Sequence, residues 1–87
     1  MARFLLHAPH TDEECTQALD SIMGHSISLL GRFDWGCQAG EHVGWVIVEA
    51  QDDTTALKML PSTIRDDARA TRLNKFTAGE VKAFHEG

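Results

Sequence analysis

The sequence has no tyrosine, only two cysteines, only two prolines and no long apolar run. Two cysteines cannot build the disulfide framework of many small secreted proteins. No stretch approaches the roughly 20 apolar residues of a membrane-spanning helix. The N-terminal apolar run is too short, and too soon interrupted, to predict a signal peptide. These absences predict reduced thiols, a cytoplasmic location and no association with membranes.

Basic residues are also scarce. Eight Lys and Arg against 13 Asp and Glu give a formal net charge of −5, and the basic residues are scattered along the chain. Because phosphate backbones are bound by clustered Lys and Arg, nucleic acid is not an expected partner. Gly36, Gly40 and Gly44 lack the strand-to-helix context of a phosphate-binding loop, so no nucleotide cofactor is expected either.

What is present predicts one small folded domain over residues 1–87. Hydrophobic residues make up 43% of the chain and charged residues 24%, which is the composition of an ordinary globular protein. Hydrophobic patterning and turn residues predict four strands, over residues 3–8, 26–33, 42–50 and 69–76.

Three helices are predicted between and after these strands. The first is expected to begin at a capping box formed by Thr11 and Glu14 and to end at a left-handed Gly24. Asp52 or Asp53 is expected to cap the second, with one more helical turn after Pro61 through Ile64. The last helix, over residues 78–86, is expected to begin at a capping box formed by Thr77 and Glu80.

The resulting order, β-α-β-β-α-β plus a C-terminal helix, predicts an α+β, ferredoxin-like fold. Its four-stranded antiparallel sheet would have the first and third strands in the centre and both long helices on one face. The third strand is nevertheless apolar on both faces: Val43, Trp45 and Ile47 alternate with Val46, Val48 and Ala50.

Two helices can cover only one face of this sheet. The other face would expose an apolar patch of several hundred Å², which monomers rarely tolerate. We therefore predict a homodimer that packs through the sheet face. The alternative is that helix 78–86 folds back over that face within one chain; in a dimer, the same helix is expected to cover an edge of the partner.

Residues 29–60, LLGRFDWGCQAGEHVGWVIVEAQDDTTALKML, carry a family resemblance. They resemble the central segment of small uncharacterised proteins of the dimeric α+β barrel superfamily, in which an LLGRW strand, a glycine turn, a G-x-x-(I/L)-V-E strand and a D-D-x-x-A helix start follow in order. The resemblance implies this fold and dimerisation. Relatives include muconolactone isomerases and cofactor-free monooxygenases, but no catalytic motif of theirs can be placed here, and a shared fold does not select a function.

The primary expectation is thus a small homodimeric module that binds a small-molecule ligand or serves an accessory role. Its pocket would lie between sheet and helices and be lined by His7, Trp35, His42 and Trp45. As an alternative, His7 or His42 could act as a general base in a small isomerase or oxygenase, because imidazole titrates near neutral pH. The sequence does not decide whether the protein is an enzyme.

A second alternative is a transition-metal site. If the first and third strands are antiparallel neighbours, His7, His10, Cys37 and His42 can meet at one rim of the sheet. Imidazole and thiolate ligands suit Zn, Cu or Ni. The other cysteine, Cys15, is interpreted as a small buried hydrophobe on the apolar face of the first helix. His25 and His85, each near the C-terminus of a helix, are interpreted as surface residues.

Overall fold

The computed structural model describes residues 1–86, whose elements form an antiparallel sheet with helices packed on one side. In chain order the elements are β1 (Ala2–Pro9), α1 (Cys15–His25), α2 (Ile27–Arg32), β2 (Asp34–Trp35), η1 (Cys37–Ala39), β3 (Val43–Ala50), α3 (Asp53–Leu57), α4 (Ser62–Arg65), β4 (Arg69–Leu73) and α5 (Ala78–Glu86). The strands form one sheet in the order β2-β3-β1-β4. The predicted α+β class, the antiparallel sheet and the central position of the first and third strands are confirmed.

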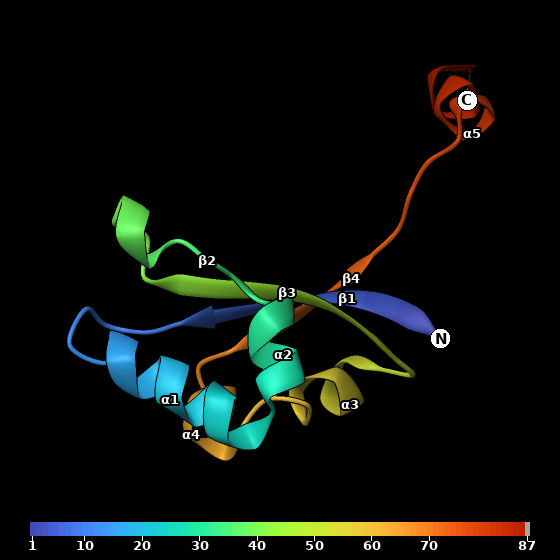
Figure 1. Cartoon of the computed structure of the whole chain (residues 1–87). Helices are drawn as coiled ribbons and strands as arrows, with labels where there is room; N and C mark the ends of the chain where they lie inside the picture. The colour runs from blue at the N-terminus through green and yellow to red at the C-terminus, as the bar shows by residue number, and fades with distance from the viewer. Residues whose placement is uncertain (87) are drawn as a thin grey trace.

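The core lies between the sheet and the helices α1 to α4, which cover a single face (Figure 1). Alternate residues of β1 and β3 point into it and are at most 4% exposed: Phe4, Leu6, Ala8, Val46, Val48 and Ala50. Buried residues of the helices, including Ile22, Leu29 and Leu60, pack against them. This period of two along the strands is the expected pattern for a sheet with one face buried.

The prediction of a strand over residues 26–33 is wrong. Ile27–Arg32 form helix α2, and the second strand is reduced to Asp34–Trp35. The hydroxyl of Ser26 accepts a hydrogen bond from the Leu29 backbone N–H at 3.1 Å, which is the contact of a helix N-cap. A short apolar run has no periodicity that separates strand from helix, and the cap decides between them.

The two predicted capping boxes are confirmed. The Thr11 N–H donates to the Glu14 carboxylate at 3.0 Å, and the Glu14 N–H donates to the Thr11 hydroxyl at 3.2 Å. Thr77 and Glu80 exchange the same two bonds ahead of α5. Glu14 loses proton affinity as a result: the Thr11 N–H and hydroxyl stabilise its carboxylate and lower its pKa.

The remaining boundaries follow local contacts. Of the two acids proposed to cap the second helix, Asp52 does so, accepting from the Thr55 N–H at 2.7 Å. The predicted end of the first helix at Gly24 is wrong, because α1 continues through it to His25. The fourth strand ends at Leu73, three residues before its predicted end.

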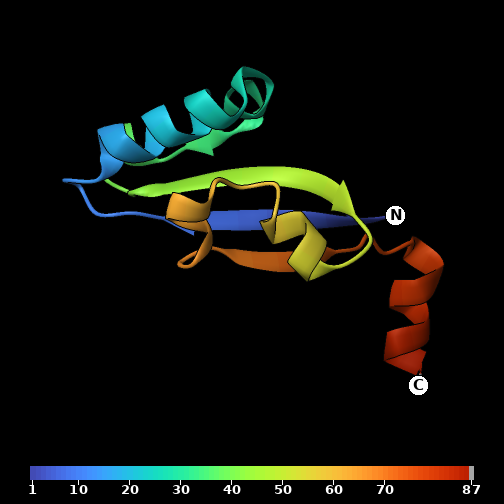
Figure 2. The same cartoon turned by 90° about the horizontal axis from the view of Figure 1, so that it is seen from below.

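The second face of the sheet carries none of the helices α1 to α4 (Figure 1). Register places Leu5 opposite Ile47 and His7 opposite Trp45 on this face, which we call the open face. Ile47 is 47% exposed there. The alternative in which residues 78–86 fold back over the open face is not the observed arrangement, because α5 stands away from the sheet beyond the end of β4 (Figures 1 and 2).

Candidate metal centre

Four potential metal ligands meet at one end of the sheet. They are His10, which follows β1; Cys15, the first residue of α1; Cys37, in η1; and His42, which precedes β3. One ligand atom from each lies within 4.8 Å of the ligand atoms of the other three. All four residues are half-buried. We call this group the His/Cys cluster.

Strand pairing brings the two histidines together. β1 and β3 are antiparallel with Pro9 opposite Val43. His10, which follows Pro9, and His42, which precedes Val43, are therefore neighbours. The backbone N–H of His10 indeed donates to the carbonyl oxygen of His42 at 3.0 Å. The planes of the two imidazoles are 70° apart, and their ring centroids are 5.7 Å apart.

The turn between β2 and β3 brings Cys37 to the same end. Gly40 ends η1 with φ of 89°, a left-handed conformation that suits glycine. At Gly36 a side chain is excluded, since a Cβ would lie 2.7 Å from the Glu41 carbonyl oxygen. The glycines of this segment therefore shape a tight turn, and the turn places the Cys37 sulfur 3.2 Å from Nε2 of His10.

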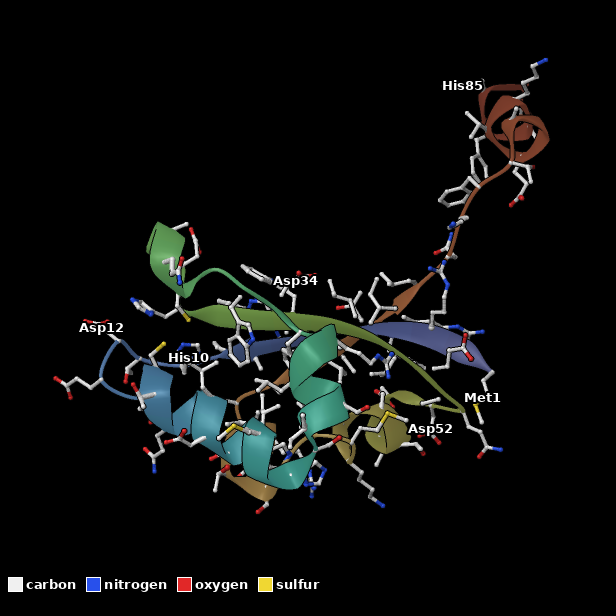
Figure 3. All side chains as sticks on the ribbon, in the orientation of Figure 1. Met1, His10, Asp12, Asp34, Asp52 and His85 are labelled. Carbon is white, nitrogen blue, oxygen red and sulfur yellow. The ribbon has the colours of Figure 1, made fainter. Side chains whose placement is uncertain are left out.

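Asp12 supports the cluster from outside. Its carboxylate lies 3.3 Å from Nε2 of His42, and Figure 3 shows Asp12 near His10 at this end of the molecule. Within residues 1–86, the second ring nitrogen of His42, Nδ1, is buried and has no hydrogen-bond partner. A carboxylate on one imidazole nitrogen commonly orients the other nitrogen toward a metal ion. Nδ1 of His42 therefore has no protein partner that would compete with a metal ion.

The thiol of Cys37 is held in its neutral form. Burial raises its pKa, and the nearby Cys15, through a hydrogen bond and through its charge, raises it further. Such a thiol becomes a thiolate at neutral pH only when a cation takes the place of its proton. In the metal-free cluster the neutral Cys37 thiol therefore lies beside two imidazoles and the Cys15 sulfur, and both cysteines are free of disulfides.

The dimensions of the cluster are close to those of a tetrahedral zinc site. With Zn–N near 2.0 Å and Zn–S near 2.3 Å, ligand atoms around zinc are roughly 3.3 to 3.8 Å apart. The His10–Cys37 distance is 3.2 Å and the largest separation in the cluster is at most 4.8 Å. Shifts of about 1 Å would close the four ligands on one ion. A site with four protein ligands leaves no open position, which is typical of structural rather than catalytic zinc.

The sequence predicted three of these four residues. His10, Cys37 and His42 come together as expected, whereas His7 lies apart: its ring packs edge-on against Trp45 on the open face, with 6.3 Å between centroids. Side-chain alternation along β1 explains the difference, because His7 points away from the helices that Leu6 and Ala8 face. Cys15 was not among the predicted members of the cluster, although the capping box just before it already predicted a helix start at this end.

The residues predicted to line a ligand pocket divide between two places. His7 and Trp45 lie together on the open face. Trp35 instead stacks on Phe33, with 5.0 Å between centroids, and lies 6.0 Å from the ring of His10. His42 belongs to the His/Cys cluster.

A cavity of about 240 Å³ lies beside the cluster, between α1 and α4. Its wall includes His10, Glu14, Ser21 and Asp67. None of the four residues predicted to line a ligand pocket is among its lining residues.

Comparison of the chain with protein-family models, with curated proteins and with solved structures found no match. The superfamily resemblance of residues 29–60 therefore stays a prediction. Among the described residues, no helix is both long enough and apolar enough to cross a bilayer.

Proposed function

We propose that this protein binds a transition-metal ion, with zinc as the best fit, through His10, Cys15, Cys37 and His42. The observation that carries the proposal is the convergence of the four ligand atoms within 4.8 Å from two separate segments of the chain, residues 10–15 and 37–42. The unpartnered Nδ1 of His42 and the carboxylate of Asp12 on its other nitrogen support it.

The donor set favours zinc over the alkaline-earth metals. Two thiolates and two imidazoles are soft or borderline ligands, whereas Mg²⁺ and Ca²⁺ prefer carboxylate, carbonyl and water oxygens. Thiolates also bind Cu(I) and imidazoles bind Ni²⁺, so a test must compare metals. Thiol ligands need reducing surroundings, which supports a cytoplasmic location for the protein.

A bound ion would join the end of β1, the start of α1, the turn η1 and the start of β3. The proposed role is therefore that of a metal-binding module whose metal fixes this end of the sheet. The central positions of β1 and β3 and the single helical layer support a ferredoxin-like assignment, and with it the homodimeric module that the resemblance implies.

Cobalt substitution tests the proposal directly. Co²⁺ in a tetrahedral site with thiolate ligands gives intense visible bands and sulfur-to-metal charge transfer in the near ultraviolet. We expect one Co²⁺ per chain with both signals, displaced by one equivalent of Zn²⁺. Cys15→Ser and Cys37→Ser should each weaken the charge-transfer band, while His85→Ala, far from the cluster, should leave the spectrum unchanged.

His7→Ala separates the observed cluster from the set predicted by sequence. Because His7 packs on Trp45 and not on the cluster, its replacement should keep the cobalt spectrum. A protein that binds neither Co²⁺, Zn²⁺, Cu(I) nor Ni²⁺ at micromolar concentration would refute the proposed function.

A further inference from the structure

The cavity between α1 and α4 adjoins a second, outer hollow. The cavity has a volume of about 240 Å³ and the outer hollow a volume of about 390 Å³. Both are lined by Pro9, His10, Glu14 and Asp67. These four residues therefore surround the opening at which the two spaces meet. The helices that form the walls of the cavity contact each other on the helical side of the sheet (Figure 1).

The inner part of the cavity suits a small apolar group. Ala18 of α1 is buried and Ile64 of α4 is half-buried, and both line the cavity but not the outer hollow. Ser21 and Thr63 line the same inner part and bring hydroxyl groups to it. Its volume of about 240 Å³ is below the roughly 300 to 1,000 Å³ of pockets that hold drug-sized ligands. The cavity therefore fits a ligand of about the size of one substituted ring.

The opening carries negative charge that no basic side chain neutralises. Among residues 1–86, neither Glu14 nor Asp67 forms an ion pair with Lys or Arg, and no Lys or Arg lines either space. Arg65, the one basic residue of α4, donates instead to the carbonyl oxygens of Leu60 and Lys58, at 2.8 and 3.4 Å. The N-terminus of α1 carries about half a positive charge, which the charges of two carboxylates outweigh. The opening therefore favours a cation.

The capping box holds the Glu14 carboxylate in place and in its charged form. Its Oε1 accepts a hydrogen bond from the Thr11 N–H at 3.0 Å, and the Thr11 N–H and hydroxyl lower its pKa. An ionised carboxylate has about four acceptor sites, so this bond leaves others for a ligand. Asp67, which follows α4, lines the same opening from the opposite wall. An ammonium group has three N–H donors and can therefore bond to both walls at once.

We propose that the cavity between α1 and α4 binds a small primary amine, whose ammonium group lies between Glu14 and Asp67 and whose apolar part packs against Ala18 and Ile64. The site is separate from the His/Cys cluster, because neither carboxylate is among the four ligands of the cluster. His10 belongs to both, with Nε2 toward the Cys37 sulfur. A zinc ion held by two thiolates and two neutral imidazoles has no net charge, so amine binding does not depend on the metal.

Three probes of the same shape test the charge that the cavity recognises. Phenethylamine, 2-phenylethanol and 3-phenylpropionate each carry a phenyl ring on a two-carbon chain, which ends in a cation, a neutral hydroxyl and an anion respectively. In two-dimensional NMR titrations of the metal-free protein at pH 7.5, we expect phenethylamine to bind with a Kd of about 1 millimolar. This binding should be at least fivefold tighter than that of either other probe, and the largest shift changes should lie at Ala18 and Ile64.

Salt gives a second measure of the same charge. Raising NaCl from about 20 to about 500 millimolar should raise the Kd of phenethylamine at least threefold, because the carboxylates at the opening are screened. Equal affinities for phenethylamine and 2-phenylethanol, or shift changes confined to residues outside the cavity, would overturn the proposal.

Matched pairs of charge removals locate the ammonium group. Glu14→Gln keeps the capping box, since glutamine serves at this position as glutamate does. It should raise the Kd of phenethylamine at least threefold, and so should Asp67→Asn. Glu13→Gln and Asp66→Asn remove the same charge one position earlier, from residues that do not line the cavity, and each should change the Kd less than twofold. Equal effects of the two pairs would overturn the placement of the ammonium group.

The amine site and the metal site are tested apart. Cys37→Ser removes a ligand of the cluster and should bind phenethylamine as the wild type does. Glu14→Gln should in turn keep the cobalt spectrum, because Glu14 is not a ligand of the cluster. Failure of either proposal is therefore distinguishable from failure of the other.

Discussion

Zinc should stabilise this protein because the folded chain holds ligands that the unfolded chain has to gather. His10 and Cys37 are 27 positions apart in sequence but 3.2 Å apart in the structure. Closing a loop of that length in the unfolded chain costs about 3.5 kcal/mol in the chain-entropy model. Zinc that binds both states should therefore favour the folded state by about that amount.

This free energy converts to a large thermal shift. For a domain of this size, 1 kcal/mol of stability raises the melting temperature by roughly 4 to 8 °C. Saturating Zn²⁺ should thus raise the melting temperature by roughly 15 to 25 °C over the protein in chelator. Differential scanning calorimetry at pH 7.5, with a phosphine reductant that does not bind zinc, measures it.

Variants decide whether the shift comes from the His/Cys cluster. Cys37→Ser should lose most of it, because it removes one of the two thiolates and leaves only three ligands for the ion. His85→Ala, which keeps the whole cluster, should retain it. A zinc-dependent rise below about 3 °C, or an equal rise in Cys37→Ser, would refute the reasoning, since zinc would then bind no preformed site.

Three further predictions concern single contacts. Asp12→Ala should weaken zinc affinity about 10- to 100-fold in a chelator competition assay, because it removes the carboxylate that orients His42. An affinity within threefold of the wild type would contradict that role of Asp12. Ser26→Ala should lower the free energy of unfolding by about 1 kcal/mol in urea titrations, since Ser26 caps α2, whereas no loss is expected if residues 26–33 were a strand. The Thr55 N–H and hydroxyl lower the pKa of Asp52 in the folded protein. The stability from this cap is therefore present above the pKa of Asp52 in the unfolded chain and is lost as pH falls through its pKa in the folded protein. Asp52→Asn should lose less stability than the wild type between about pH 5 and pH 2, and equal losses would contradict the assignment.

Local sequence signals predicted the parts of the fold that depend on neighbouring residues. The Thr11–Glu14 box and the Asp52 cap are contacts within three positions, and such contacts form wherever a helix begins. The prediction of a strand over residues 26–33 was wrong, although the signal that decides it is also local. The cap at Ser26 is equally local, but the apolar run after it fits either a strand or a helix, and packing of Leu29 into the core accompanies the helix.

The candidate site shows where such reasoning stops. The antiparallel pairing of the first and third strands predicted that His7, with His10 just beyond it, lies near His42. The register instead pairs His7 with Trp45, and His10 is the residue beside His42. The choice between His7 and Cys15 depends on side-chain direction instead. Alternation along β1 takes His7 to the open face, and the first turn of α1 takes Cys15 into the cluster. The side of the sheet on which the first helix lies determines both outcomes, and that is a property of tertiary packing.

The ionisation of Cys37 distinguishes a metal site from a redox pair. Two cysteines this close could serve as a dithiol, but a reactive dithiol needs one thiol with a lowered pKa, since the thiolate is the nucleophile. Here burial and the neighbouring Cys15 raise the pKa of Cys37, so at neutral pH the thiol is a poor nucleophile. The two imidazoles next to the same sulfurs complete the set of four ligands that a tetrahedral ion takes. The composition of the cluster and the protonation of its thiol therefore both favour metal binding over thiol exchange.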